Sequence, residues 1–135
     1  MRKIEPFDGG IIVVDKPAGW TSHDVVNRVR RLYDTRQVGH TGTLDPLATG
    51  VLAVLVGRAV KASEYLSAHD KCYEARFRLG VVSDTGDITG SLTETGASIP
   101  PADAVLAAAR AMQGKQMQTP PMTSAVKVAG KKLVD

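Results

Sequence analysis

Two uninterrupted apolar runs stand out along the chain, at residues 11–14 and 51–56. Gly9 and Gly10 precede the first run, and the turn-forming segment 15–19 follows it. Short apolar runs between turn signals are typical of buried strands. We therefore predict a buried strand at each run, and the second run is apolar enough to be the central strand of a sheet.

Apolar positions spaced three and four residues apart predict an amphipathic helix over residues 22–33, with Thr21 or Ser22 as its N-cap. A short helix is expected at about 58–67. The alanine-rich segment 100–114 predicts a third helix, because its prolines are tolerated in a first turn and its closing glycine is a stop signal.

The second half of the chain shows shorter patterns. Apolar and polar residues alternate over 71–79, which predicts a half-buried strand with Tyr73 on its inward face. Turn-forming residues at 83–91 should join a strand to another near 91–95, and a further strand is expected at 123–128. Hairpin-like strands mixed with scattered helices favour the α+β class over a doubly wound sheet.

Composition narrows the class of protein. The 135 residues are 43% hydrophobic and 23% charged, which is the balance of a folded chain about one domain long. Neither a membrane-spanning run nor a signal peptide is recognisable, so we expect a protein that is neither membrane-embedded nor secreted. A single cysteine, Cys72, allows no internal disulfide, and this favours the cytoplasm.

The chain has 17 basic and 14 acidic residues, a net charge of +3. The segment 28–36 holds four arginines against Asp34 and so carries a charge of +3 by itself. Two interpretations stay open. The arginines lie on the solvated face of the helix, or they form a patch that faces phosphates.

The sequence contains no complete motif for binding a metal ion. His69 and Cys72 are the only pair at metal-ligand spacing, and zinc needs three or four converging ligands, so we expect no metal. Asp84 and Asp87 lack the further ligands of a calcium loop. We interpret them as Asx-turn residues that shape a hairpin.

Asp45 is a different case. It lies in the glycine-rich loop 36–50, directly before Pro46, and the strand that starts at Val51 anchors the loop. A carboxylate is ionised at neutral pH and so needs no partner base to act as a nucleophile. The alternative is an aspartate that caps its own loop, and on spacing alone that alternative is favoured.

Residues 39–52, Gly-His-Thr-Gly-Thr-Leu-Asp-Pro-Leu-Ala-Thr-Gly-Val-Leu, closely resemble the catalytic motif of the TruB family of tRNA pseudouridine synthases. Segments 15–22, 71–75 and 120–127 resemble the same family. Leu-Ala at 47–48 resembles the stand-alone bacterial enzymes more than the guide-RNA-dependent dyskerin branch.

The resemblance implies an isomerase that converts uridine 55 of the tRNA T loop into pseudouridine, without a cofactor or metal. It implies the pseudouridine synthase fold, a mixed and mainly antiparallel sheet flanked by helices and loops, incomplete in this chain. Residues 1–135 would be the N-terminal part of the catalytic domain, with the C-terminal half and any RNA-binding domain absent. The expected partner is the tRNA T stem-loop; no protein partner or membrane is implied, and the localisation is cytoplasmic.

The resemblance also implies roles for single residues. Asp45 matches the family's nucleophile, while His40 and Tyr73 match residues that contact the flipped-out nucleotide. Lys16 and Pro17 match a motif that supports the catalytic loop, and Trp20 is expected to pack beside that loop. No catalytic arginine of the family is matched, so this chain alone should be weakly active at best. The alternatives are a non-catalytic RNA-binding fragment, a dyskerin-like synthase and a purely structural fragment.

Overall fold

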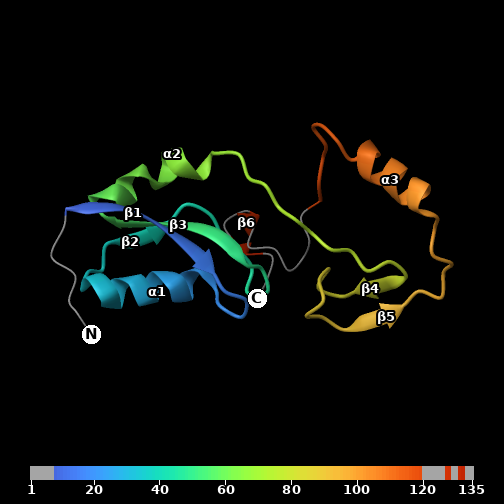
Figure 1. Cartoon of the computed structure of the whole chain (residues 1–135), viewed down its shortest axis with the longest axis horizontal. Coiled ribbons are helices and arrows are strands. Elements are labelled where there is room, and N and C mark those ends of the chain that lie inside the picture. The colour runs from blue at the N-terminus through green and yellow to red at the C-terminus, as the bar shows by residue number, and fades with distance from the viewer. Residues whose placement is uncertain (1–7, 120–126, 129–130, 133–135) are drawn as a thin grey trace. The chain divides into compact units, whose positions relative to one another are not determined.

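The computed structural model describes residues 8–119, 127–128 and 131–132 (Figure 1). The chain divides into two compact units, Met1–Tyr73 and Glu74–Asp135, and each is described by itself. Small antiparallel sheets combine with short helices in these units. The predicted α+β class is therefore confirmed.

A three-stranded antiparallel sheet forms the first unit. Its strands are β1 (Gly9–Lys16), β2 (Val38–His40) and β3 (Gly50–Gly57), in the order β1-β3-β2. β3 is central, as its apolar sequence predicts. β1 is confirmed as a strand, but Ile11 and Val13 are 54% and 69% exposed, so it buries one face rather than two.

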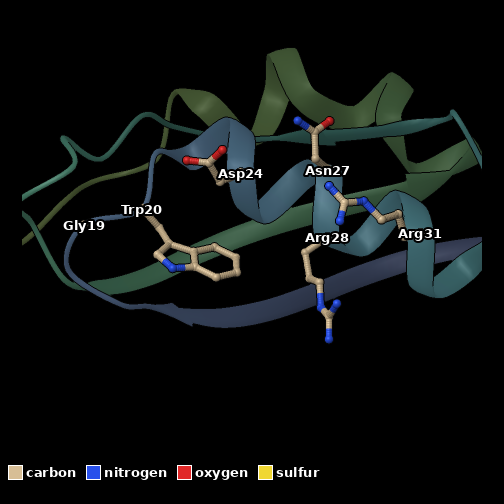
Figure 2. A pocket seen from close by; sticks show the side chains of 6 residues that line it. All are labelled: Gly19, Trp20, Asp24, Asn27, Arg28 and Arg31. Atoms are coloured by element: carbon tan, nitrogen blue, oxygen red, sulfur yellow. The ribbon is translucent and has the colours of Figure 1, made fainter. Parts of the chain in front are cut away.

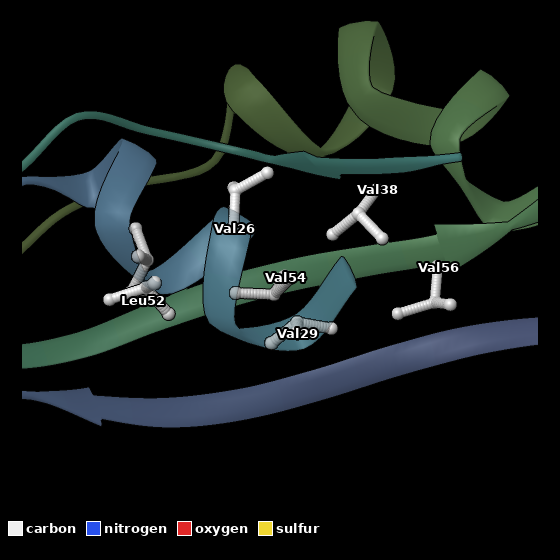
Figure 3. Packing of buried hydrophobic residues seen from close by; sticks show 7 residues of the cluster. Val26, Val29, Val38, Leu52, Val54 and Val56 are labelled. Atoms are coloured by element: carbon white, nitrogen blue, oxygen red, sulfur yellow. The ribbon is translucent and has the colours of Figure 1, made fainter. Parts of the chain in front are cut away.

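One helix covers the buried face of this sheet. α1 (Ser22–Tyr33) has the predicted bounds and is capped by Thr21, whose side chain accepts a hydrogen bond from the backbone N–H of Asp24. Its valines pack against β2 and β3 (Figure 3). The core residues are Val25, Val26, Val29, Val38, Leu52, Val54 and Val56.

The helix predicted at 58–67 is present as two successive pieces, the 3-10 helix η1 (Arg58–Ala62) and α2 (Ser63–Ser67). The second unit contains β5 and α3, as predicted, while the strand that pairs with β5 is β4 rather than the segment predicted at 71–79; β6 and β7 pair further along. Their bounds are β4 (Val81–Ser83), β5 (Leu92–Glu94), α3 (Ala102–Ala111), β6 (Lys127–Val128) and β7 (Lys131–Lys132). Of the strand predicted at 123–128, only the last two residues lie within the described chain.

The Asx-turn interpretation is confirmed for Asp87, whereas Asp84 shapes the hairpin through a longer-range bond to a residue seven positions on. Asp84 Oδ1 accepts a 2.8 Å hydrogen bond from the backbone N–H of Ser91, and Asp87 Oδ1 accepts one of 2.8 Å from that of Thr89. Each carboxylate therefore closes the turn between β4 and β5.

The strand predicted at 71–79 is wrong. These residues are irregular and exposed, and Tyr73 and Phe77 are 66% and 85% exposed. Alternating polarity produces a strand only where a neighbouring strand completes the hydrogen-bond ladder. None of the described strands pairs with this segment, so its apolar side chains have no face to cover.

Candidate active site

Asp45 lies between two residues that are tied to the sheet and helix of the first unit. On its N-terminal side, Leu44 N donates a 2.9 Å hydrogen bond to Ser22 Oγ, and this hydroxyl donates one of 3.2 Å to Leu44 O. Ser22 is buried at the start of α1. The helix N-terminus therefore holds the residue directly before Asp45.

Lys16 holds the residue on the other side. It is the last residue of β1, its side chain is 0% exposed, and its Nζ donates to Pro17 O at 3.0 Å, Trp20 O at 2.6 Å and Pro46 O at 3.4 Å. Gly19 N adds a 2.7 Å bond to Pro46 O. Three carbonyl oxygens satisfy the three donors of an ammonium group, so this lysine serves as a structural brace.

The Asp45 carboxylate itself is exposed, and it forms no hydrogen bond or ion pair with any residue that the structure describes. Only its backbone is engaged, because Asp45 O accepts a 3.0 Å hydrogen bond from Ala48 N. A loop-capping aspartate would use its side-chain oxygens. Within the described chain, the geometry thus favours a presented carboxylate over the capping alternative.

His40 ends β2, opposite Val54 of β3, and is half-buried. Its Nδ1 atom is buried and has no hydrogen-bond partner among the described residues. A buried nitrogen of this kind is costly unless a partner arrives. His40 therefore has an unused hydrogen-bonding atom at the start of the Asp45 loop.

Tyr73 is not held on a strand, but the segment that leads to it lies against the same loop. A methyl group built on Gly42 would stand 3.8 Å from Cε of Lys71. No hydrogen bond joins the Asp45, His40 and Tyr73 side chains in the described structure. Lys71 thus lies against the loop of Asp45, but no hydrogen bond in the described structure holds the Tyr73 ring there.

A hollow of about 330 Å³ opens beside α1 and was not predicted from the sequence (Figure 2). Trp20, expected to pack beside the loop, instead exposes 41% of its surface and lines this hollow. We call it the Trp20 hollow. Its lining residues are Gly19, Trp20, Asp24, Asn27, Arg28 and Arg31.

The arginines of segment 28–36 differ in their surroundings, and Arg30 fits neither the solvated-face nor the phosphate-facing interpretation. Arg30 donates to Asn27 Oδ1 at 3.2 Å and to Val38 O at 3.4 Å, so it links α1 to β2. Arg28 and Arg31 line the Trp20 hollow. The periodicity shows which residues share a helix face, but only the packing shows which arginine is already engaged.

Neither a metal cluster nor a membrane span is found in the part of the chain that the structure describes. No three His, Cys, Asp or Glu side chains come close enough to hold an ion. Likewise, no described helix combines the length and apolarity needed to cross a bilayer. Cys72 is an exposed free thiol.

The sequence of this chain also matches the model of a known protein family. Residues 30–135 match the TruB family pseudouridylate synthase (N terminal domain). Since the match covers most of the chain, the chain belongs to this family, and the resemblance noted in the sequence is confirmed.

Particular relatives agree with this assignment. The chain is similar to the tRNA pseudouridine synthase B of Thermobifida fusca (strain YX), at 55% identity over 91% of this chain and 42% of the relative. The protein of the same name from Gluconacetobacter diazotrophicus is 51% identical over 99% and 44%. That from Bacillus subtilis (strain 168) is 49% identical over 93% and 41%. The chain spans about two-fifths of the length of these relatives.

Proposed function

We propose that the protein containing this chain isomerises uridine to pseudouridine in tRNA, at position 55 of the T loop. The observation that carries this proposal is the exposed, unpaired carboxylate of Asp45, held between Leu44 and Pro46 by the Ser22 and Lys16 contacts. The names of the relatives support tRNA pseudouridine synthesis as the reaction class.

In this proposal Asp45 is the nucleophile. It attacks either the anomeric carbon of the ribose or the uracil ring, and both routes lead through a covalent intermediate. The C–N bond to ribose breaks, the uracil rotates, and a C–C bond forms. The proton lost from the uracil carbon is balanced by one gained at its ring nitrogen. The reaction is redox-neutral and transfers nothing to a second molecule, so its stoichiometry requires no cofactor.

His40 and Tyr73 are assigned to substrate binding. A uridine stacked in a folded loop must be flipped out before a carboxylate can reach it, at a cost of a few kcal/mol. The His40 ring is half-buried at the end of β2, so its exposed part, rather than the buried Nδ1, would contact the extruded nucleotide. The exposed ring of Tyr73 is free to stack on the base, which is a common way of holding splayed RNA bases.

We further propose that this chain is the N-terminal part of the catalytic domain, because it spans about two-fifths of its relatives. An arginine that pairs with the nucleophile, as the family resemblance implies, would then come from the remainder. The non-catalytic alternative, an RNA-binding fragment, predicts RNA affinity without pseudouridine formation.

The test compares wild type with Asp45→Asn in the full-length protein, using an unmodified T stem-loop and carbodiimide adduct mapping of pseudouridine. Removal of a nucleophile should lower the rate by about 10³-fold or more. The matched control is Asp103→Asn, which removes another exposed carboxylate, in the first turn of α3, and should keep the full rate. Full activity in Asp45→Asn would refute the assignment.

A further inference from the structure

The Trp20 hollow combines an exposed indole with two cationic side chains. Figure 2 shows the Trp20 ring beside the first turns of α1, with Arg28 and Arg31 extending from the same helix. Within the described chain, neither guanidinium forms a hydrogen bond or ion pair, and Trp20 makes no ring contact. The two guanidinium groups and the indole ring are therefore not engaged by other residues of the described chain.

Asp24 is the residue best placed to neutralise Arg28, because residues four apart share a helix face. Its carboxylate is already engaged in the cap. Asp24 Oδ2 accepts 2.8 Å and 2.6 Å hydrogen bonds from the backbone N–H and the hydroxyl of Thr21. These donors are neutral, so the Asp24 carboxylate keeps its negative charge; with two arginines against this one aspartate, the lining of the hollow carries a net charge of +1.

Arg30 provides an internal contrast on the same helix. Its guanidinium serves the fold by bonding Asn27 and Val38. Arg28 and Arg31 make no such contacts within the described structure, and both side chains are exposed. Arginine without an internal partner beside an aromatic ring is the chemistry that binds phosphate and a stacked base together.

We propose that the Trp20 hollow binds one unpaired nucleotide of an RNA strand, with its base stacked on Trp20 and its phosphate held by Arg28 and Arg31. A volume of about 330 Å³ lies at the lower end of small-ligand sites, which run from about 300 to 1,000 Å³. The identity of the RNA rests on the proposed function, whereas the nucleotide chemistry rests on the hollow itself.

The hollow is joined to the Asp45 loop by the brace described above. Lys16 Nζ donates both to Trp20 O and to Pro46 O, and Gly19 N also donates to Pro46 O. A nucleotide held in the hollow therefore lies at a fixed offset from the carboxylate. The inferred role is to position the RNA backbone while a different nucleotide reaches Asp45.

The test uses the intrinsic fluorescence of the full-length protein, and the Trp20 emission is taken as the difference between wild type and Trp20→Leu, because Trp20 is the only tryptophan of these 135 residues. Single-stranded oligouridylate should quench this emission, and an abasic strand of the same length should quench it much less. Equal quenching by the abasic strand, by inorganic phosphate or by polyglutamate would overturn the proposal, since none of these offers a base to stack.

The arginines are tested through the salt dependence of binding to a labelled oligouridylate. Loss of one phosphate contact to a single strand should lower the slope of log affinity against log salt by about 0.7. Arg28→Gln and Arg31→Gln should each show this reduction. Arg58→Gln removes the same charge from an exposed position on η1 and should not. The proposal would be contradicted if Arg28→Gln and Arg31→Gln changed the salt slope no more than Arg58→Gln does.

Trp20→Leu should weaken oligouridylate binding about 10-fold, measured by anisotropy of the labelled strand. Tyr65→Leu is the matched control, since that ring is 80% exposed on α2, and it should bind as wild type does. Asp45→Asn should keep the quenching. The two proposals can therefore fail separately. Pseudouridine formation tests the proposed function, and quenching of the Trp20 emission tests the hollow.

Discussion

The two units of the chain differ in how much they bury. Every buried residue in the range 8–119 belongs to the first unit, and none of residues 74–119 is buried. Eight register pairs join β1 to β3, whereas three join β4 to β5. A helix with an apolar face therefore acquires a core only where a sheet is wide enough to receive it.

The difference in burial between the two units also decides which residues of the candidate site are anchored. The Asp45 loop is anchored at Lys16 and Ser22, both of them buried in the first unit. Tyr73 lies where the first unit ends and has no strand to hold it. Precise presentation of a side chain thus follows from the buried contacts behind it, which are local to the first unit.

The largest contrast is expected between two leucines. Leu52 is 2% exposed in the core of the first unit, and Leu52→Ala should lower the free energy of unfolding by about 2 to 5 kcal/mol. Leu106 on α3 is 57% exposed, and Leu106→Ala should change it by no more than about 0.5 kcal/mol. Urea denaturation followed by circular dichroism measures both. Comparable losses would show that the second unit has an equivalent core.

The next effect concerns the brace. Lys16→Met leaves the carbonyl oxygens of Pro17, Trp20 and Pro46 without their charged donor, and the expected loss is about 2 to 3 kcal/mol of unfolding free energy. Lys61→Met, on the exposed surface of η1, should be nearly neutral. In the full-length protein, Lys16→Met should also slow pseudouridine formation at temperatures where the variant stays folded. Unchanged rate and stability would mean that the loop does not need this lysine.

A smaller loss is expected at the cap of α1. Thr21→Ala removes the hydroxyl that accepts the backbone N–H of Asp24 at 3.0 Å, which should lower the free energy of unfolding by about 1 kcal/mol. Thr21→Ser keeps a hydroxyl and should restore most of that stability. Thermal unfolding of the two variants beside wild type distinguishes the cap from the loss of a methyl group.

The smallest effect is a dependence on pH. The hydroxyl and then the backbone N–H of Thr21 hold the pKa of Asp24 below its ordinary value of 3.8. Because the folded pKa is depressed, this carboxylate contributes stability above pH 3.8 and loses it as the pH falls through the folded pKa. The difference in melting temperature between wild type and Asp24→Asn should therefore shrink below about pH 4. A difference that persists unchanged in acid would exclude ionisation as its source.

Asp87 offers the matched comparison in the second unit. The hydroxyl and backbone N–H of Thr89, followed by the hydroxyl of Thr85, lower its pKa in the same way. Since its hairpin has no buried core, Asp87→Asn should alter the acid dependence of global unfolding less than Asp24→Asn does. A larger response at Asp87 would reverse the ranking of the two units.

The sequence by itself determined those helices and strands whose capping residues and apolar spacing lie within their own segment. The extent of α1 could be predicted because its apolar spacing and its capping residue, offered by Thr21 or Ser22, are local features; the structure assigns the cap to Thr21. The central place of β3 follows from an apolar run that has to be covered on both sides. The motif at 39–52 led to the family, and the match to residues 30–135 agrees with it.

Tertiary structure decided the features that depend on a neighbour. The alternation at 71–79 describes a strand, yet no described strand pairs with it, so Tyr73 is exposed. The Lys16 ammonium group is held by two carbonyls of the turn that follows it and by a third from Pro46, thirty residues on. Trp20 is exposed because nothing in the described chain covers it. A sequence pattern specifies which side chains share a face, but burial depends on whether another segment of the chain comes to lie against that face.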